Sequence, residues 1–185
     1  MFIQTETTPN PATLKFLPGR EVLGQGSADI KTAEEAAQRS PLAAKLFGVA
    51  GVTGVFLGQD FVTVTKAEDQ DWHLMKPALL GAIMEHFTSG APVLSQAAGA
   101  AHGAADGENA EIVNQIIELL DTRVRPAVAQ DGGDIVFDRF EEGVVYLHMQ
   151  GSCSGCPSST ATLKAGIENM LRHYIPEIVE VRAVA

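Results

Sequence analysis

The two cysteines of the chain, Cys153 and Cys156, lie three residues apart, and the 185 residues contain no others. They belong to the segment 151–159, whose small residues allow backbone N–H groups to approach the sulfurs. Two thiolates at this spacing can face a single object, which is either a metal centre or the other sulfur. The spacing therefore predicts a functional site more readily than two small buried apolar side chains.

The segments on either side place the cysteines on a loop between a strand and a helix. Residues 144–149 have the composition of a strand, and apolar residues recur at helical spacing from 163 to 174. Pro157 suits a first helical turn, where a missing N–H costs nothing. Because the N-terminus of a helix carries partial positive charge, we expect this position to favour the thiolate form of each cysteine.

Three kinds of chemistry fit such a pair. The cysteines could form a reversible disulfide, as in a thiol–disulfide oxidoreductase. They could instead bind zinc, which takes four ligands, or an iron–sulfur cluster, which takes about four thiolates. For either metal the missing ligands must come from elsewhere, and a second copy of the chain on a two-fold axis is the simplest donor. The residues alone predict paired thiolates and a shared metal, without choosing between the metals.

Other residues that could do chemistry have simpler structural explanations. On a strand, His148 shares a face with Val144 and Tyr146, so we expect a histidine on the surface of a sheet. Asp131 and Asp134 flank two glycines and are expected to shape that turn. No glycine-rich phosphate loop or nucleophile–base arrangement is recognisable in the sequence.

The composition sets broad limits on function. The chain is 45% apolar and 19% charged, which is typical of a globular protein, and its net charge of −10 argues against binding nucleic acid. No apolar run is long enough to span a membrane. The first residues lack the features of a secretory signal and are not rich in Arg and Ser, so we expect no transit peptide in the sequence.

The pattern of elements predicts an α+β fold of two small domains. Residues 1–87 form the first, with strands expected at 2–7, 13–17, 52–57 and 61–65 and helices at 32–39, 41–47 and 72–87. Trp72, at the start of the last helix, is expected to pack against the core or cap the domain, and not to stack on a ligand. Residues 88–107 are rich in Ala and Gly and predict a flexible linker.

Residues 108–185 predict a second domain with the order α-β-β-α-β. Its first helix is expected at 111–124, with Pro126 just past its end. The apolar stripe of that helix is predicted to comprise Ile112, Ile116, Leu119, Leu120 and Val124. Strands at 135–140 and 144–149, a helix to residue 174 and a last strand at 178–184 complete the domain.

Motifs in both halves resemble the Nfu-type iron–sulfur scaffold or carrier proteins. The second half resembles the NifU-like C-terminal domain through 131–134 (Asp-Gly-Gly-Asp), 151–159 (Gly-Ser-Cys-Ser-Gly-Cys-Pro-Ser-Ser), 162–164, 166–168 and 174–177. The first half resembles the Nfu N-terminal domain through 2–5, 8–11, 14–16, 40–43, 61–66 and 71–72.

The resemblance implies a [4Fe-4S] cluster bridged between two subunits, with Cys153 and Cys156 of each subunit as ligands. It implies partnership with recipient apoproteins and iron–sulfur assembly factors, and a carrier role instead of an enzymatic one. Because mitochondrial members are made with a targeting extension, it also favours a bacterial cytoplasmic protein, with the mature mitochondrial matrix form as the alternative. An oxidoreductase and a zinc-linked interaction module remain the competing interpretations.

Overall fold

The computed structural model describes residues 2–95, 107, 109–153 and 157–184, with no side-chain detail at 157–159. The chain divides into two compact units, which we call the N-terminal unit (residues 1–100) and the C-terminal unit (residues 101–185). Each unit contains both helices and a sheet, so the predicted α+β class is confirmed. Most of the predicted linker, 88–107, lies outside the described residues, and its flexibility stays a prediction.

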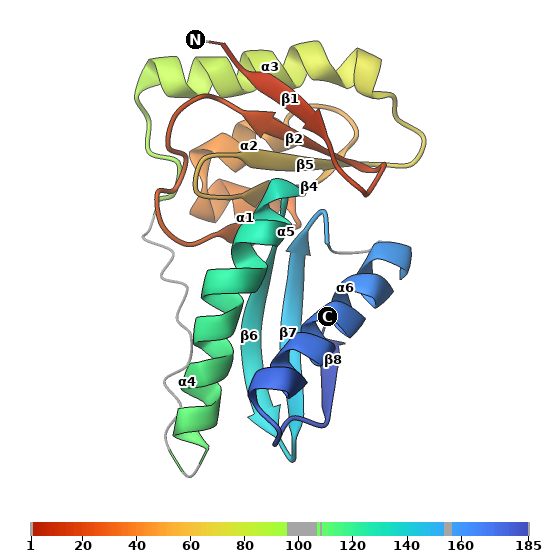
Figure 1. Ribbon diagram of the computed structural model, residues 1–185. Helices are drawn as coiled ribbons and strands as arrows, with labels where there is room; N and C mark the ends of the chain where they lie inside the picture. Colours follow the sequence, from red (N-terminus) through yellow and green to blue (C-terminus); the bar gives the residue numbers. More distant parts are fainter. Residues whose placement is uncertain (1, 96–106, 108, 154–156, 185) are drawn as a thin grey trace. The chain divides into compact units, whose positions relative to one another are not determined.

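The N-terminal unit is built on a five-stranded antiparallel sheet with the order β1-β2-β5-β4-β3 (Figure 1). The strands are β1 (Gln4–Thr7), β2 (Thr13–Leu17), β3 (Ala28–Ile30), β4 (Val52–Leu57) and β5 (Val62–Lys66). Strand β3 was not predicted, because three residues that follow a Gly- and Ser-rich stretch carry too little alternation to be recognised. It forms through pairing with β4 at the edge of the sheet.

Three helices complete this unit: α1 (Ala33–Arg39), α2 (Pro41–Phe47) and α3 (Trp72–Ser89). Ser40 ends α1 and begins α2, where its hydroxyl accepts from the N–H of Ala43 at 3.1 Å, so the predicted helix start at Ser40-Pro41 is confirmed. Helices α2 and α3 pack on each other and share one apolar core with the sheet. Trp72 packs against this core and donates from Nε1 to the carbonyl of Pro11 at 3.2 Å, in agreement with its predicted packing role.

His86 makes the stability of the N-terminal unit sensitive to acid. It is fully buried near the end of α3, and burial, followed by the nearby charge of Lys45, lowers its pKa below the usual 6.5. In acid the unfolded chain therefore binds a proton more readily than the folded one, and stability present above pH 6.5 is lost as the pH falls toward the lowered pKa. We expect His86→Leu to remove part of this loss between pH 7.5 and about 5.

The fluorescence of Trp72 reports the unfolding of the N-terminal unit, because Trp72 is the only tryptophan of the chain and lies in this unit. Urea unfolding followed by its fluorescence, at several pH values, gives the stability of this unit. His73→Gln is the matched control, since His73 lies exposed on the same helix. An acid-induced loss of stability that is identical in the parent and in His86→Leu would contradict the prediction.

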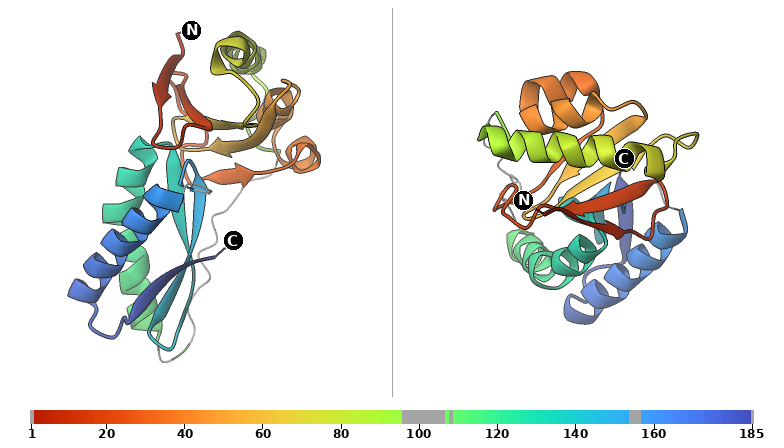
Figure 2. Two further views of the ribbon diagram at one scale, coloured as in Figure 1. Left: turned by 90° about the vertical axis from the view of Figure 1, so that its right-hand side faces the viewer. Right: turned by 90° about the horizontal axis from the view of Figure 1, so that it is seen from above.

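The C-terminal unit has a three-stranded sheet with the order β6-β7-β8, in which β6 and β7 are antiparallel and β7 and β8 are parallel. Its elements, in chain order, are α4 (Ala110–Leu119), η1 (Leu120–Val124), α5 (Arg125–Gln130), β6 (Gly133–Glu141), β7 (Val144–Gly151), α6 (Pro157–Tyr174) and β8 (Glu180–Val184). The predicted order α-β-β-α-β is present. The helices cover one face of the sheet, and the core lies between them and the strands (Figure 2).

The first helix of this unit continues past Pro126, so the predicted helix end was wrong. A π-helical turn, η1, links α4 to α5, and Pro126 stands in the first turn of α5, where proline is tolerated. The residue added by the π turn also changes the buried stripe, which comprises Val113, Ile116, Leu120, Val124 and Val128. Ile112 and Leu119, predicted for this stripe, are only partly buried.

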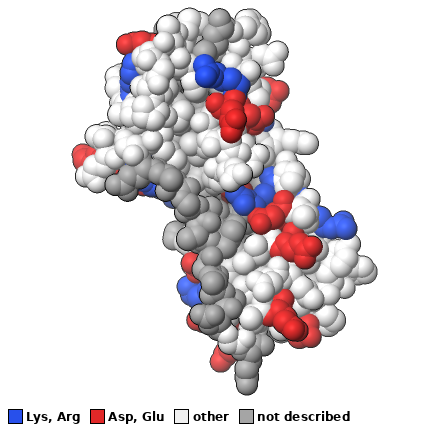
Figure 3. All heavy atoms as spheres, turned by 90° about the vertical axis from the view of Figure 1, so that its left-hand side faces the viewer, with Lys and Arg blue, Asp and Glu red and all other residues white. Residues whose placement is uncertain are grey.

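On the side drawn in Figure 3, the C-terminal unit carries scattered acidic side chains, with basic ones beside some of them. Residues 108–185 contain twelve acidic and six basic residues, a net charge of −6. In the part of the chain that the structure describes, no helix combines the length and the apolar composition required to cross a membrane.

Candidate metal-binding site

Cys153 lies between the end of β7 and the start of α6, as the sequence predicted. Gly151 turns the chain out of β7 with a φ of 63°, a backbone conformation that residues other than glycine rarely adopt. Cys153 is 7% exposed and belongs to the apolar core of the C-terminal unit. Cys156 lies outside the described residues, so its predicted place beside Cys153 is not tested.

Gly133, the first residue of β6, provides the space into which the Cys153 side chain packs. A Cβ at position 133 would lie 2.5 Å from Cys153 Sγ, closer than carbon and sulfur atoms approach without a bond, and 3.1 Å from Cys153 N, which is a tight contact. Gly133 pairs with Gly151 across the β6–β7 ladder, so the register of the sheet brings it to the cysteine loop. The Gly-Gly turn therefore forms one wall of the cysteine site, a role that its sequence did not reveal.

Hydrogen bonds fasten the cysteine loop to this turn and to α6. Ser152 donates its N–H to the carbonyl of Gly132 at 3.2 Å and its hydroxyl to the carbonyl of Asp131. On the other side, Thr160 Oγ1 donates to the carbonyl of Cys153 at 3.1 Å. The backbone that carries Cys153 is thus held from two sides, and none of these three bonds could be recognised from residue types alone.

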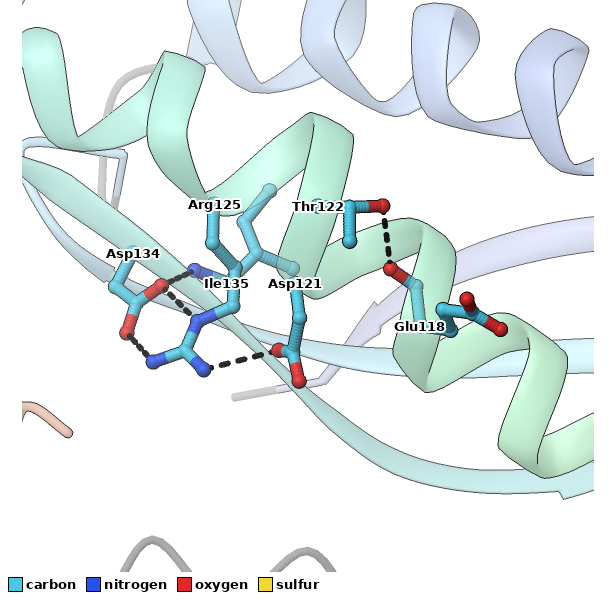
Figure 4. Close-up of polar contacts among 6 residues, drawn as sticks. All are labelled: Glu118, Asp121, Thr122, Arg125, Asp134 and Ile135. Carbon is cyan, nitrogen blue, oxygen red and sulfur yellow. Dashed lines mark hydrogen bonds and ion pairs between the residues drawn. The ribbon is translucent and has the colours of Figure 1, made fainter. Parts of the chain in front are cut away.

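Asp134, next to Gly133, forms a two-pronged ion pair with Arg125 (Figure 4). The Nε and Nη2 atoms of Arg125 donate to Oδ1 and Oδ2 of Asp134, each at 2.9 Å, while Nη1 donates to Asp121 at 3.0 Å. These bonds, above all the one to Asp134, raise the pKa of Arg125 further above its usual value. Asp134 lies in β6 and bonds to Arg125 and Ile135, so its predicted role in shaping the turn stays a prediction, and its partner Arg125 was missed.

The remaining predicted candidates do not extend the site. His148 lies half-exposed on the sheet surface, as expected, with Nε2 3.0 Å from Asp138 Oδ1. Over the described residues, no group of three or more His, Cys, Asp or Glu side chains could hold a metal ion. Because the whole chain has two cysteines, Cys153 and Cys156 together can supply only half of a four-thiolate set.

Two family matches together span most of the chain. Residues 3–90 match the family described as "Scaffold protein Nfu/NifU N terminal", and residues 116–182 match the "NifU-like domain".

Proteins of two fruit flies are similar to the chain over its whole length. Both are called "NFU1 iron-sulfur cluster scaffold homolog, mitochondrial". The protein of Drosophila persimilis is 54% identical over 184 residues, and that of Drosophila willistoni is 53% identical. The alignments cover 100% of this chain but only 65% and 64% of the relatives. A solved NifU-like protein from Saccharomyces cerevisiae is 33% identical and aligns with a TM-score of 0.47, over 52% of this chain and 86% of its own.

Proposed function

Because the chain belongs to the Nfu/NifU family of scaffold proteins, we propose that it binds an iron–sulfur cluster and delivers it to recipient apoproteins. The observation that best supports this function is the placement of Cys153 on a glycine-walled loop before α6. We propose Cys153 and Cys156 as the ligands of the cluster. The names of the relatives support a scaffold, which is a carrier role and not a catalytic one.

Two thiolates per chain lead to a cluster shared between two subunits. A [4Fe-4S] cluster takes about four thiolates, which two copies of Cys153 and Cys156 supply. Closed two-fold symmetry would bring the two cysteine loops together. Half of the ligands are then lost whenever the subunits part, so a shared cluster is easier to release than one enclosed by a single chain.

Delivery requires only an exchange of thiolates. A cysteine of the recipient protein replaces Cys153 or Cys156 at the cluster, and the proton that the recipient thiol loses is taken up by the departing thiolate or by water. No electron is transferred in this step, so it needs no oxidant or reductant. The N-terminal unit lacks cysteines, and we propose that it binds recipients or assembly factors.

For the location of the protein, the relatives are named mitochondrial, which favours the alternative expectation of a mature mitochondrial form. The comparisons give no support to the first expectation, a bacterial cytoplasm. We therefore propose the mitochondrial matrix.

Anaerobic reconstitution with iron and sulfide tests the proposed cluster. After gel filtration we expect a brown dimer with about four iron and four sulfide per two chains, because four thiolates are required. Metal analysis and the elution volume give both quantities. Zinc without sulfide would favour the interaction module, and a colourless monomer with a reversible Cys153–Cys156 disulfide would favour the oxidoreductase; either result would contradict the proposal.

A further inference from the structure

We propose that Arg125 is a positioning residue for the cysteine site. Through Asp134 it holds the start of β6, the wall against which Cys153 packs, and so fixes the place of the ligand thiol. The inference rests on the proposed function for its significance, but the contacts that carry it lie within the C-terminal unit and can be tested without any metal.

The π turn determines where Arg125 stands. The N–H of Arg125 bonds to the carbonyl of Leu120, five residues earlier, instead of four as in an α-helix. Thr122 adds a hydroxyl bond to the carbonyl of Glu118 at 2.7 Å, a local contact of the kind that bends helices. The extra residue rotates the following helix, and the guanidinium of Arg125 reaches both Asp121 and Asp134 (Figure 4). Single π turns inside helices are frequent at functional sites.

From Asp134 the connection to the cysteine is one residue long. Asp134 Oδ1 also accepts from the N–H of Ile135 at 2.8 Å, so the carboxylate is fixed to its own strand as well as to Arg125. Gly133 is the preceding residue, and the space between it and Cys153 Sγ is too small for one more carbon atom. A movement of this strand end therefore changes the space that is left to the thiol.

Burial separates the important bond of this network from the minor one. The side chains of Arg125 and Asp134 are 19% and 7% exposed, whereas that of Asp121 is 39% exposed. Removing one partner of a largely buried pair leaves the other charge less well compensated, whereas an exposed pair contributes little. Asp121→Asn should therefore disturb Cys153 much less than Arg125→Gln.

The reactivity of Cys153 measures how firmly the thiol is held. In a Cys156→Ser background Cys153 is the only cysteine of the chain, so its alkylation by iodoacetamide can be followed directly. We expect Arg125→Gln to raise the alkylation rate about tenfold or more, because local opening exposes the thiol, and Asp121→Asn to raise it less than about threefold. An unchanged rate in Arg125→Gln would overturn the inference.

Two controls separate positioning from a general loss of stability. Arg139→Gln removes an exposed arginine that bonds to Asp138 at 2.9 Å on the same strand, and it should leave the rate unchanged. Val181→Ala weakens the core through β8, away from the cysteine loop. The alkylation rates of Val181→Ala and Arg125→Gln are compared in urea, at concentrations that give the C-terminal unit equal stability in both. If the two rates are raised equally, Arg125 has only a structural role and the proposal is wrong.

Cluster retention links the inference to the proposed function. With both cysteines present, we expect the reconstituted Arg125→Gln protein to lose iron to a chelator several-fold faster than the parent, and Arg125→Lys to recover little, since lysine cannot make the two-pronged contact. Equal rates of iron loss in the parent and Arg125→Gln would contradict the role in retention. If the parent binds no cluster at all, the proposed function fails, while the alkylation rates still decide whether Arg125 positions Cys153.

Discussion

Reconstituted Cys153→Ser and Cys156→Ser variants are expected to retain no stable iron–sulfur cluster. A serine hydroxyl stays protonated near neutral pH and does not replace the soft thiolate ligand that the cluster requires. In a shared site each substitution removes two of the four ligands, one from each subunit, so a single change acts twice. Iron and sulfide counts after gel filtration, together with the visible absorption of the cluster, measure the loss.

Both serine variants should still fold, but we expect the substitution at Cys153 to lower the stability of the C-terminal unit. Cys153 lies in the apolar core, so a hydroxyl at this position is expected to lower the stability of the C-terminal unit by about 1–3 kcal/mol. His148→Gln is the matched control for the metal site: it removes a half-exposed histidine of β7, five residues before Cys153, and should retain the full cluster. Full cluster content in either serine variant, or its loss in His148→Gln, would refute the ligand assignment.

The parts of the site that follow from short stretches of sequence could be predicted. Alternating residues in β7, the Gly-rich segment and Pro157 carry enough local information to place Cys153 between a strand and a helix. The same holds for α2, whose start was recognised from Ser40 and Pro41. In each case the interactions that determine the element lie within one or two turns of chain.

The rest of the site depends on contacts between residues that are distant in the sequence. Gly133 meets Cys153 only because the β6–β7 register pairs Gly133 with Gly151, and register is a property of the folded sheet. The Arg125–Asp134 pair depends on a π turn, which has no recognised residue pattern and which made Pro126 look like the end of a helix. Strand β3 was missed for a related reason, since it is defined by its pairing with β4.

Gly133→Ala is expected to damage both the fold of the C-terminal unit and its metal binding. The new methyl group would meet Cys153 Sγ and two backbone atoms, the oxygen of Gln150 and the nitrogen of Cys153, at 2.5–3.1 Å. Backbone atoms cannot turn aside as a flexible side chain can, so the β6–β7 end must shift by a few tenths of an ångström to admit the methyl group. We expect a loss of about 1–3 kcal/mol in the stability of the unit, the usual cost of overpacking. Faster amide hydrogen exchange in β6 and β7 would report it.

Gly166→Ala provides the control for Gly133→Ala, because both changes add one methyl group to the same unit. Gly166 is exposed in α6, and a Cβ there would meet no other atom within 4 Å, so alanine should stabilise the helix by up to about 1 kcal/mol. We expect Gly133→Ala to hold far less iron and sulfide than the parent after reconstitution, and Gly166→Ala to match the parent. If Gly133→Ala matches the parent in both hydrogen exchange and cluster content, the close contact between Gly133 and Cys153 does not constrain the site. The positioning role of Arg125 acts through this contact and would then be wrong as well.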